Sequence, residues 1–274
     1  MSNSGGNSGA SLINLGDISK PATVLIEKIS EAVGGVFRPH QIRRVAQAEA
    51  DAERIRAISR IEVTDLERRA LQRFVQEEAK QQANMEDITR LALPEVSQEA
   101  KPQDVEKDWL ADFFAKCRLI SNEDMQRLWA KVLAGEANSP GSYSKRTVAL
   151  LSSLDKSDAR LFRNLCSFAW YFGALVPLIY DITADIYLKK GVNFLNLVHL
   201  NDIGLLRFDS LAEFGNTAAP QKLGCAYYGT QLGIEFPKPE GNMMQFGHVL
   251  LSKTGQQLAP ICGSELGLLR KNGQ

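Results

Sequence analysis

The stretch from Asp108 to Glu136, DWLADFFAKCRLISNEDMQRLWAKVLAGE, decides the fold of this 274-residue chain. Its first part spaces Trp109, Phe113 and Cys117 four residues apart, which places all three side chains on one face of a helix. Ser121-Asn-Glu-Asp124 has the pattern of a capping box and predicts a second helix through the rest of the stretch. Two adjacent amphipathic helices of this kind predict a helical core.

Further helix starts follow along the chain. After the turn expected at 138–141, Ser142 is expected to cap a helix, and Asp155 with Asp158 is expected to cap the next one. Together with the opening stretch, these patterns predict a central helical bundle over residues 104–188.

The N-terminal part is expected to hold long helices over residues 16–92, preceded by a disordered tail over residues 1–15 that is rich in Ser, Gly and Asn. Apolar residues at helical spacing predict a helix that begins at Ser19 and is ended by Gly34-Gly35. The segment from Gln41 to about Asn84 contains neither Gly nor Pro and mixes charges of both signs. It predicts one long or broken helix that packs along a narrow seam, against a copy of itself in one interpretation.

The C-terminal part, residues 189–274, is richer in Gly and has a different pattern. A helix is expected over residues 192–200, strands between 223 and 236, and a further strand over residues 246–251. A capping-box pattern at Thr254-Gly-Gln-Gln257 predicts a last helix. This order predicts an α+β winged-helix-like unit, so the chain as a whole is expected to be mainly α.

Composition narrows the class of protein. The chain has 32 Lys plus Arg and 32 Asp plus Glu, so its formal net charge is zero. It therefore lacks the excess of basic residues that is typical of a general nucleic-acid-binding protein. Its four cysteines form no CxxC or CxxH pair, so their spacing indicates neither a zinc site nor a redox motif. The most hydrophobic stretch, residues 167–180, is shorter than the ~20 residues that cross a bilayer. These features predict a soluble, cytoplasmic protein.

Few residues are candidates for chemistry. His40, His199 and His248 lie far apart and show no metal-ligand spacing. The spacing of Asp181 and Asp185 would place both carboxylates on one helical face, where they could bind a cation, although acids on helix faces are more often solvated. None of the common hydrolase, metalloprotease or nucleotide-binding strings occurs. The sequence therefore predicts no catalytic residue, no metal and no cofactor, which is to say a protein that is not an enzyme.

The strongest electrostatic feature is a set of arginines in the charged N-terminal segment. Because arginine binds phosphate bidentately, a face that gathers several of them could bind nucleic acid or anionic lipid. The interleaved acids cancel most of that field, which favours a solvated or self-pairing helix. The candidate interaction face consists of Arg43, Arg44, Arg54, Arg56, Arg60, Arg68, Arg69 and Arg73.

Four strings of the sequence carry a resemblance to a known family: LWAKVLAGE at 128–136, PGSYS at 140–144, GDISKP at 16–21 and AEADA at 48–52. They resemble an uncharacterised bacterial family, domain of unknown function 2806, and the resemblance extends over residues 12–262. The order of the helices also resembles, more loosely, the abortive-infection alpha family. The resemblance implies a bacterial protein with a part in antiphage defence and no established active site.

The function expected from the sequence is that of a non-enzymatic interaction protein, a defence sensor or recruiter that binds a protein partner or a second copy of itself. A nucleic-acid-binding regulator that uses the C-terminal winged-helix-like unit is the first alternative. The second is an effector that perturbs a membrane on activation, through the helix at Ser19–Phe37 and the segment 167–180.

Overall fold

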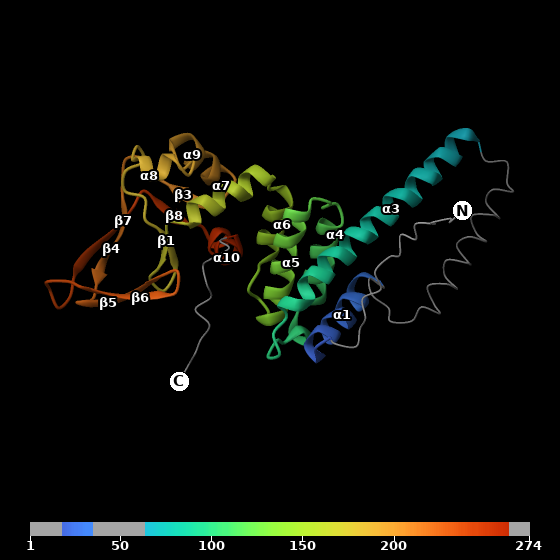
Figure 1. The fold of residues 1–274 in the computed structure, drawn as a ribbon, viewed down its shortest axis with the longest axis horizontal. Helices are drawn as coiled ribbons and strands as arrows, with labels where there is room; N and C mark the ends of the chain where they lie inside the picture. Colours follow the sequence, from blue (N-terminus) through green and yellow to red (C-terminus); the bar gives the residue numbers. More distant parts are fainter. Residues whose placement is uncertain (1–17, 35–63, 263–274) are drawn as a thin grey trace, which may run out of the picture.

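A computed structural model gives the fold of the chain and describes residues 18–34 and 64–262 (Figure 1). The helices are α1 (Lys20–Val33), α3 (Asp65–Ala92), α4 (Lys107–Cys117), α5 (Glu123–Asn138), α6 (Lys145–Ser153), α7 (Lys156–Cys166), α8 (Asp185–Leu188), α9 (Phe194–Asp202) and α10 (Lys253–Cys262), with short 3-10 turns η2 (Leu93–Glu95) and η3 (Pro102–Asp104). The strands are β1 (Ala169–Tyr171), β2 (Leu175–Pro177), β3 (Leu206–Phe208), β4 (Phe214–Ala219), β5 (Lys222–Tyr227), β6 (Thr230–Glu235), β7 (Asn242–Gly247) and β8 (Val249–Leu251). The described chain is therefore mainly α, and its strands are collected in the C-terminal part.

Helix α5 forms the centre of the helical part, and most of its side chains are buried. The ring of Trp129 packs edge-on against Phe113 with centroids 5.0 Å apart, and Phe113 stacks on Trp109 at 5.1 Å. The indole N–H of Trp109 donates a hydrogen bond to the carbonyl oxygen of Tyr143 at 2.7 Å. Each such aromatic pair contributes about 0.5–1.5 kcal/mol beyond the area that it buries. The two helices predicted from the opening stretch are confirmed as α4 and α5.

Helix α1 confirms the predicted N-terminal helix. The side chain of Ser19 accepts a hydrogen bond from the backbone N–H of Ala22 at 3.3 Å, and Gly34 follows the last turn with a φ of 77°. Glycine adopts this left-handed conformation without the steric cost of a side chain. The apolar face of α1, which includes Leu25 and Ile29, is buried in the core beside α4.

The charged N-terminal segment forms α3 over its described part. This helix continues to Ala92, beyond the predicted end near Asn84, because Asn84, Ile88 and Ala92 form a buried face next to α5. Pro94, which lacks the N–H that a continuing helix would use, lies in the turn η2 that follows. Residues 41–63 of the predicted helix lie outside the described residues.

Three predicted N-caps are wrong by one or two positions. Helices α5, α6 and α10 are capped by Asn122, Ser144 and Ser252 in place of the predicted Ser121, Ser142 and Thr254. Each cap accepts a hydrogen bond from the backbone N–H three residues later, at 3.2, 3.2 and 3.0 Å respectively. Neighbouring Ser, Thr and Asn residues fit the same pattern in sequence, so the backbone path decides among them. The predicted box of Asp155 and Asp158 is confirmed, because the N–H of Asp155 donates to Asp158 at 3.0 Å.

All paired strands of the described chain run antiparallel. The hairpin of β5 and β6 turns at Tyr228-Gly229, whose φ values of 46° and 80° suit a two-residue turn, and it confirms the strands predicted between 223 and 236. The apolar segment 167–180 supplies β1 and β2, which extend this sheet in the order β2-β1-β5-β6. Separately, β3 pairs with β8 and β4 pairs with β7. Within residues 18–34 and 64–262, no helix combines the length and the apolar character needed to cross a membrane.

The chain around α9 matches the prediction in part. Helix α9 corresponds to the helix expected over residues 192–200, and Gly204 follows it with a φ of 86°. The single strand expected over residues 246–251 is wrong, because β7 ends at Gly247 and β8 begins two residues later. Gly247 has a φ of 87°, and a Cβ there would lie 2.1 Å from the carbonyl oxygen of Ile179. The chain therefore bends at this close contact.

Helix α10 approaches the turn after α9 through Gly255, where a Cβ would lie 2.0 Å from the carbonyl oxygen of Leu205. We expect Gly255→Ala to lower the free energy of unfolding by about 2–3 kcal/mol, because backbone atoms on both sides must move. The matched control is Gly224→Ala, at a position where a Cβ meets nothing within 4 Å. Chemical denaturation of the purified proteins measures both values, and equal stability of the two variants would contradict this packing.

Candidate functional site

The N-terminal part of α3 projects away from the rest of the described protein (Figure 1). We call residues 65–80 the arm, which spans about 24 Å at 1.5 Å per residue; each of its residues is exposed except the half-buried Leu71. The N–H of Thr64 donates to the carboxylate of Glu67 at 2.9 Å, and the hydrogen bonds from Thr64 lower the pKa of Glu67. The arm is therefore a regular helix with its own cap.

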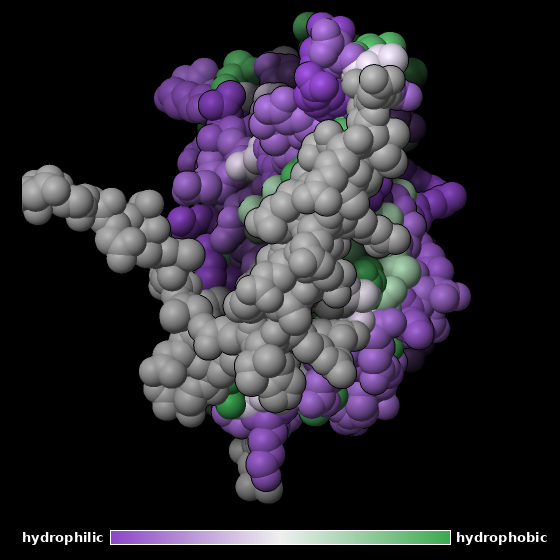
Figure 2. All heavy atoms as spheres, turned by 90° about the vertical axis from the view of Figure 1, so that its right-hand side faces the viewer, coloured by the Kyte–Doolittle hydropathy of each residue, from purple (hydrophilic) through white to green (hydrophobic). Residues whose placement is uncertain are grey.

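One side of the arm is apolar. Leu66, Ala70 and Phe74 follow one another at four-residue spacing, with Leu71 and Val75 beside them. The exposed fractions of Leu66 and Phe74 are 69% and 59%. Where atoms are coloured in Figure 2, most of this side of the molecule is hydrophilic, with scattered hydrophobic side chains. A row of large exposed apolar side chains on one helix is typical of an interaction surface.

The structure places part of the predicted interaction face on the arm. Arg68, Arg69 and Arg73 lie there and are exposed. The guanidinium of Arg68 lies 3.2 Å from the carboxylate of Asp65, and that of Arg73 lies 3.5 Å from Glu77. Two of these three arginines therefore pair with acids of the same helix. The other predicted residues, Arg43, Arg44, Arg54, Arg56 and Arg60, lie outside the described residues.

The described histidines have structural partners. The Nε2 atom of His199 lies 2.8 Å from a carboxylate oxygen of Asp158, which belongs to the cap of α7. The Nδ1 atom of His248 lies 2.9 Å from the carbonyl oxygen of Asp209, to which it donates a hydrogen bond. His40 lies outside the described residues. The two described histidines thus hold elements together.

The predicted pairing of Asp181 and Asp185 on one helical face is wrong. Asp181 lies in the turn before α8, and its carboxylate accepts hydrogen bonds from the N–H and O–H of Thr183, which lower the pKa of Asp181. Asp185 begins α8 and lies 3.3 Å from the ammonium of Lys189. Among residues 18–34 and 64–262, no group of three or more His, Cys, Asp or Glu side chains is arranged to hold a metal ion.

Glu136, near the end of α5, has a buried carboxylate that no sequence pattern predicts. It is 3% exposed and accepts hydrogen bonds from the N–H groups of Gly141 and Tyr143 at 2.7 and 2.9 Å. Burial raises the pKa of Glu136, and these hydrogen bonds act in the opposite direction. Since both oxygens bind backbone N–H groups, Glu136 holds the loop between α5 and α6 in place.

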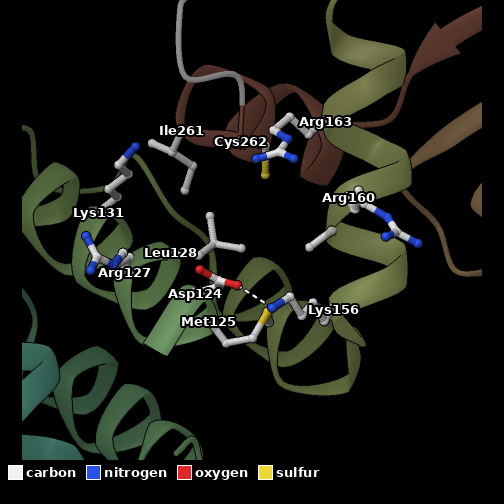
Figure 3. Close-up of a pocket in the computed structure, with 11 residues that line it drawn as sticks. Asp124, Met125, Arg127, Leu128, Lys131, Lys156, Arg160, Arg163, Ile261 and Cys262 are labelled. Carbon is white, nitrogen blue, oxygen red and sulfur yellow. Dashed lines mark ion pairs between the residues drawn. The ribbon is translucent and has the colours of Figure 1, made fainter. Parts of the chain in front are cut away.

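A basic groove that no sequence pattern predicts lies between α5 and α7, with the end of α10 at one side (Figure 3). The groove has a volume of about 260 Å³ and is lined by Asp124, Met125, Arg127, Leu128, Lys131, Lys156, Ala159, Arg160, Arg163, Ile261 and Cys262. The carboxylate of Asp124 lies 2.5 Å from the ammonium of Lys156, which lowers the pKa of Asp124. Among the described lining residues, five carry a positive charge and one carries a negative charge.

The spacing of these basic residues is visible in the sequence. Arg127 and Lys131 are four residues apart, and Lys156, Arg160 and Arg163 follow at positions i, i+4 and i+7, so each set lies on one side of its helix. The sequence does not reveal that the two sides face each other, because that depends on how α5 and α7 pack. This is why the groove could not be predicted.

Comparison with known proteins identifies a family model. The model described as Protein of unknown function (DUF2806) matches residues 68–267, a range that includes both the basic groove and most of the arm. Comparisons with curated proteins and with solved structures give no match.

The role assigned to Glu136 predicts the effect of Glu136→Gln. A glutamine offers one carbonyl oxygen where the carboxylate offers two, so the N–H of Gly141 or Tyr143 loses its acceptor. We expect the free energy of unfolding to fall by about 1–3 kcal/mol. Glu99→Gln, at an exposed position, is the control. Urea denaturation measures the free energy of unfolding of both variants. If Glu136→Gln is as stable as the control, Glu136 does not hold the loop between α5 and α6 in place.

Proposed function

The chain belongs to DUF2806, a family of proteins of unknown function, and we propose that it is a non-enzymatic interaction protein that binds another protein chain through the arm. The observation that carries this proposal is the exposed apolar side of the arm. A monomeric soluble protein seldom leaves a row such as Leu66, Phe74 and Val75 in water unless another surface covers it. Burial of these side chains in a complex would supply the driving force for association.

The partner that the arm fits best is a second copy of the chain. Residues 65–80 carry four acidic residues, Asp65, Glu67, Glu77 and Glu78, and four basic residues, Arg68, Arg69, Arg73 and Lys80. The arm is therefore neutral, and two arms can approach without net repulsion. Mixed charges beside an apolar stripe are also typical of helices that pair along a narrow seam.

A non-enzymatic role is supported by how the candidate groups for chemistry are used. Glu136 binds backbone N–H groups, His199 binds Asp158, and Asp181 binds Thr183. A general acid or base must be within reach of a substrate proton, and a group that caps or clamps its own chain is poorly placed for that role.

We infer a finer architecture as part of the same proposal: a helical bundle of α4 to α7, and a winged-helix-like unit that includes α9, β3, β8 and α10. The antiparallel pairing of β3 with β8 directly after α9 supports the second assignment. A nucleic-acid-binding use of this unit is less well supported. Helix α9 contains neither Lys nor Arg and exposes Phe194 and Leu195, which suit a protein surface better than a phosphate backbone.

A cytoplasmic role in antiphage defence is the setting that we propose for this interaction, on the strength of the resemblance to the abortive-infection alpha family. Membrane perturbation is less well supported, because Leu25 and Ile29 of α1 are fully buried and Val176 of β2 is nearly so. Exposure of these side chains to a bilayer would require the core to open.

The double substitution Leu66→Glu with Phe74→Glu tests the proposal. It places two charges on the apolar side of the arm, so we expect self-association of the full-length protein to weaken by at least about tenfold. At concentrations where the wild type is monomeric, thermal stability should be unchanged, because both side chains are exposed in the single chain. Sedimentation velocity over a range of protein concentrations measures the association.

The control is Leu211→Glu, between β3 and β4, where the side chain is 95% exposed and the two strands lie at the opposite end of the described protein from the arm (Figure 1). It should associate like the wild type. A wild-type chain that stays monomeric at all concentrations would contradict a second copy as the partner. Equal association of the wild type, the arm variant and the control would show that the arm does not form the contact. In bacteria that carry the gene, the arm variant should also lose any protection from phage that the wild type gives.

A further inference from the structure

We propose that the basic groove between α5 and α7 binds a small ligand with several adjacent phosphate groups, of the di- or triphosphate type. The groove is separate from the arm, and this proposal does not depend on the function proposed for the arm. The charges, the remaining lining and the size of the groove support this assignment (Figure 3).

The charge of the groove requires a ligand with several negative charges. Five basic side chains surround a volume of about 260 Å³, and the described lining offers the single carboxylate of Asp124, which lies 2.5 Å from Lys156. After that pair is formed, Arg127, Lys131, Arg160 and Arg163 remain to be balanced. A ligand with one carboxylate would neutralise a quarter of this charge. A triphosphate carries three to four negative charges within a few bond lengths, which matches the number of cations.

Arginine favours phosphate as the chemical group. Three of the five cations are guanidinium groups, which donate two parallel hydrogen bonds to an oxyanion and remain charged at every physiological pH. They come from both walls, Arg127 from α5 and Arg160 with Arg163 from α7. In Figure 3 the guanidinium of Arg163 points into the groove, whereas those of Arg127 and Arg160 point outward from their helices, so a ligand between the walls contacts them once these exposed side chains rotate inward. The chain as a whole has no net charge, so this local field is a property of the groove.

The remaining lining indicates that the ligand is recognised by charge. Met125, Leu128, Ala159 and Ile261 supply apolar surface, and the described lining has neither an aromatic ring for stacking on a base nor an amide for reading its edge. A volume of about 260 Å³ lies just below the range of roughly 300–1,000 Å³ for ligand pockets and suits a small ligand. We therefore expect the phosphates to supply most of the binding energy and the attached group to supply little.

Binding of inorganic triphosphate to the full-length protein tests this proposal. Isothermal titration calorimetry should detect binding that weakens steeply as salt is added, because the ligand displaces counterions from the arginines. ATP should bind within about threefold of inorganic triphosphate, whereas AMP and inorganic phosphate should bind at least about tenfold more weakly. A much tighter affinity for ATP would show that a base is recognised and would overturn recognition by charge.

The double substitution Arg127→Gln with Arg163→Gln removes one guanidinium from each wall. We expect it to weaken triphosphate binding at least about tenfold. Both side chains are exposed, so the variant should unfold at the wild-type temperature, and the single substitution Arg160→Gln provides a second, milder test. The matched control is Arg207→Gln on β3, an exposed arginine outside the groove, which should bind like the wild type.

Three results would overturn the proposal. The first is the absence of triphosphate binding at low salt. The second is binding that the two groove variants retain or that the Arg207 control loses to the same extent, because either places the anion elsewhere. The third is an affinity for single-stranded DNA that exceeds that for triphosphate and grows with strand length, which would identify a nucleic-acid backbone as the ligand.

Discussion

Burial of Trp129 at the centre of α5 is the constraint on which the described helical part depends. Its indole packs edge-on against Phe113 with centroids 5.0 Å apart, and neither ring is exposed. Helix α3 packs on α5 through its C-terminal part around Ile88, so its N-terminal part extends outward as the arm. The opposite edge of α5 carries Arg127 and Lys131 into the basic groove. One buried helix thus fixes the position of both surfaces for which we propose a binding role.

Elements set by local interactions could be predicted from the sequence. The helix after Ser19 has a capping hydroxyl at its start and Gly34 at its end, and the hairpin between 223 and 236 needs no distant contact to form. Cap positions were missed where several Ser, Thr or Asn residues lie within two positions of one another. The break at Gly247 was missed because it is caused by the approach of Ile179, which lies far away in the chain.

The two surfaces for which we propose a binding role also differ in how far the sequence predicts them. The mixed charge and sparse apolar residues of the arm are properties of one helix, and the prediction of an exposed interaction helix could be made from them. The basic groove requires the facing sides of α5 and α7 to be known together, as does the clamp in which Glu136 binds the N–H groups of Gly141 and Tyr143. Neither has a local pattern that distinguishes it from solvated helix charges.

Hydrogen exchange of the full-length protein, measured at low and at high protein concentration, tests most directly the claim that the arm is an open surface for another chain. At low concentration, amides of residues 65–80 should exchange at least about 100-fold faster than those of the buried α5, because few contacts protect them. At high concentration, the amides of the arm should become protected while those of α5 stay as they were. Slow exchange of the arm at a concentration where sedimentation shows a monomer would contradict the account, since it would show that the arm is already covered within a single chain.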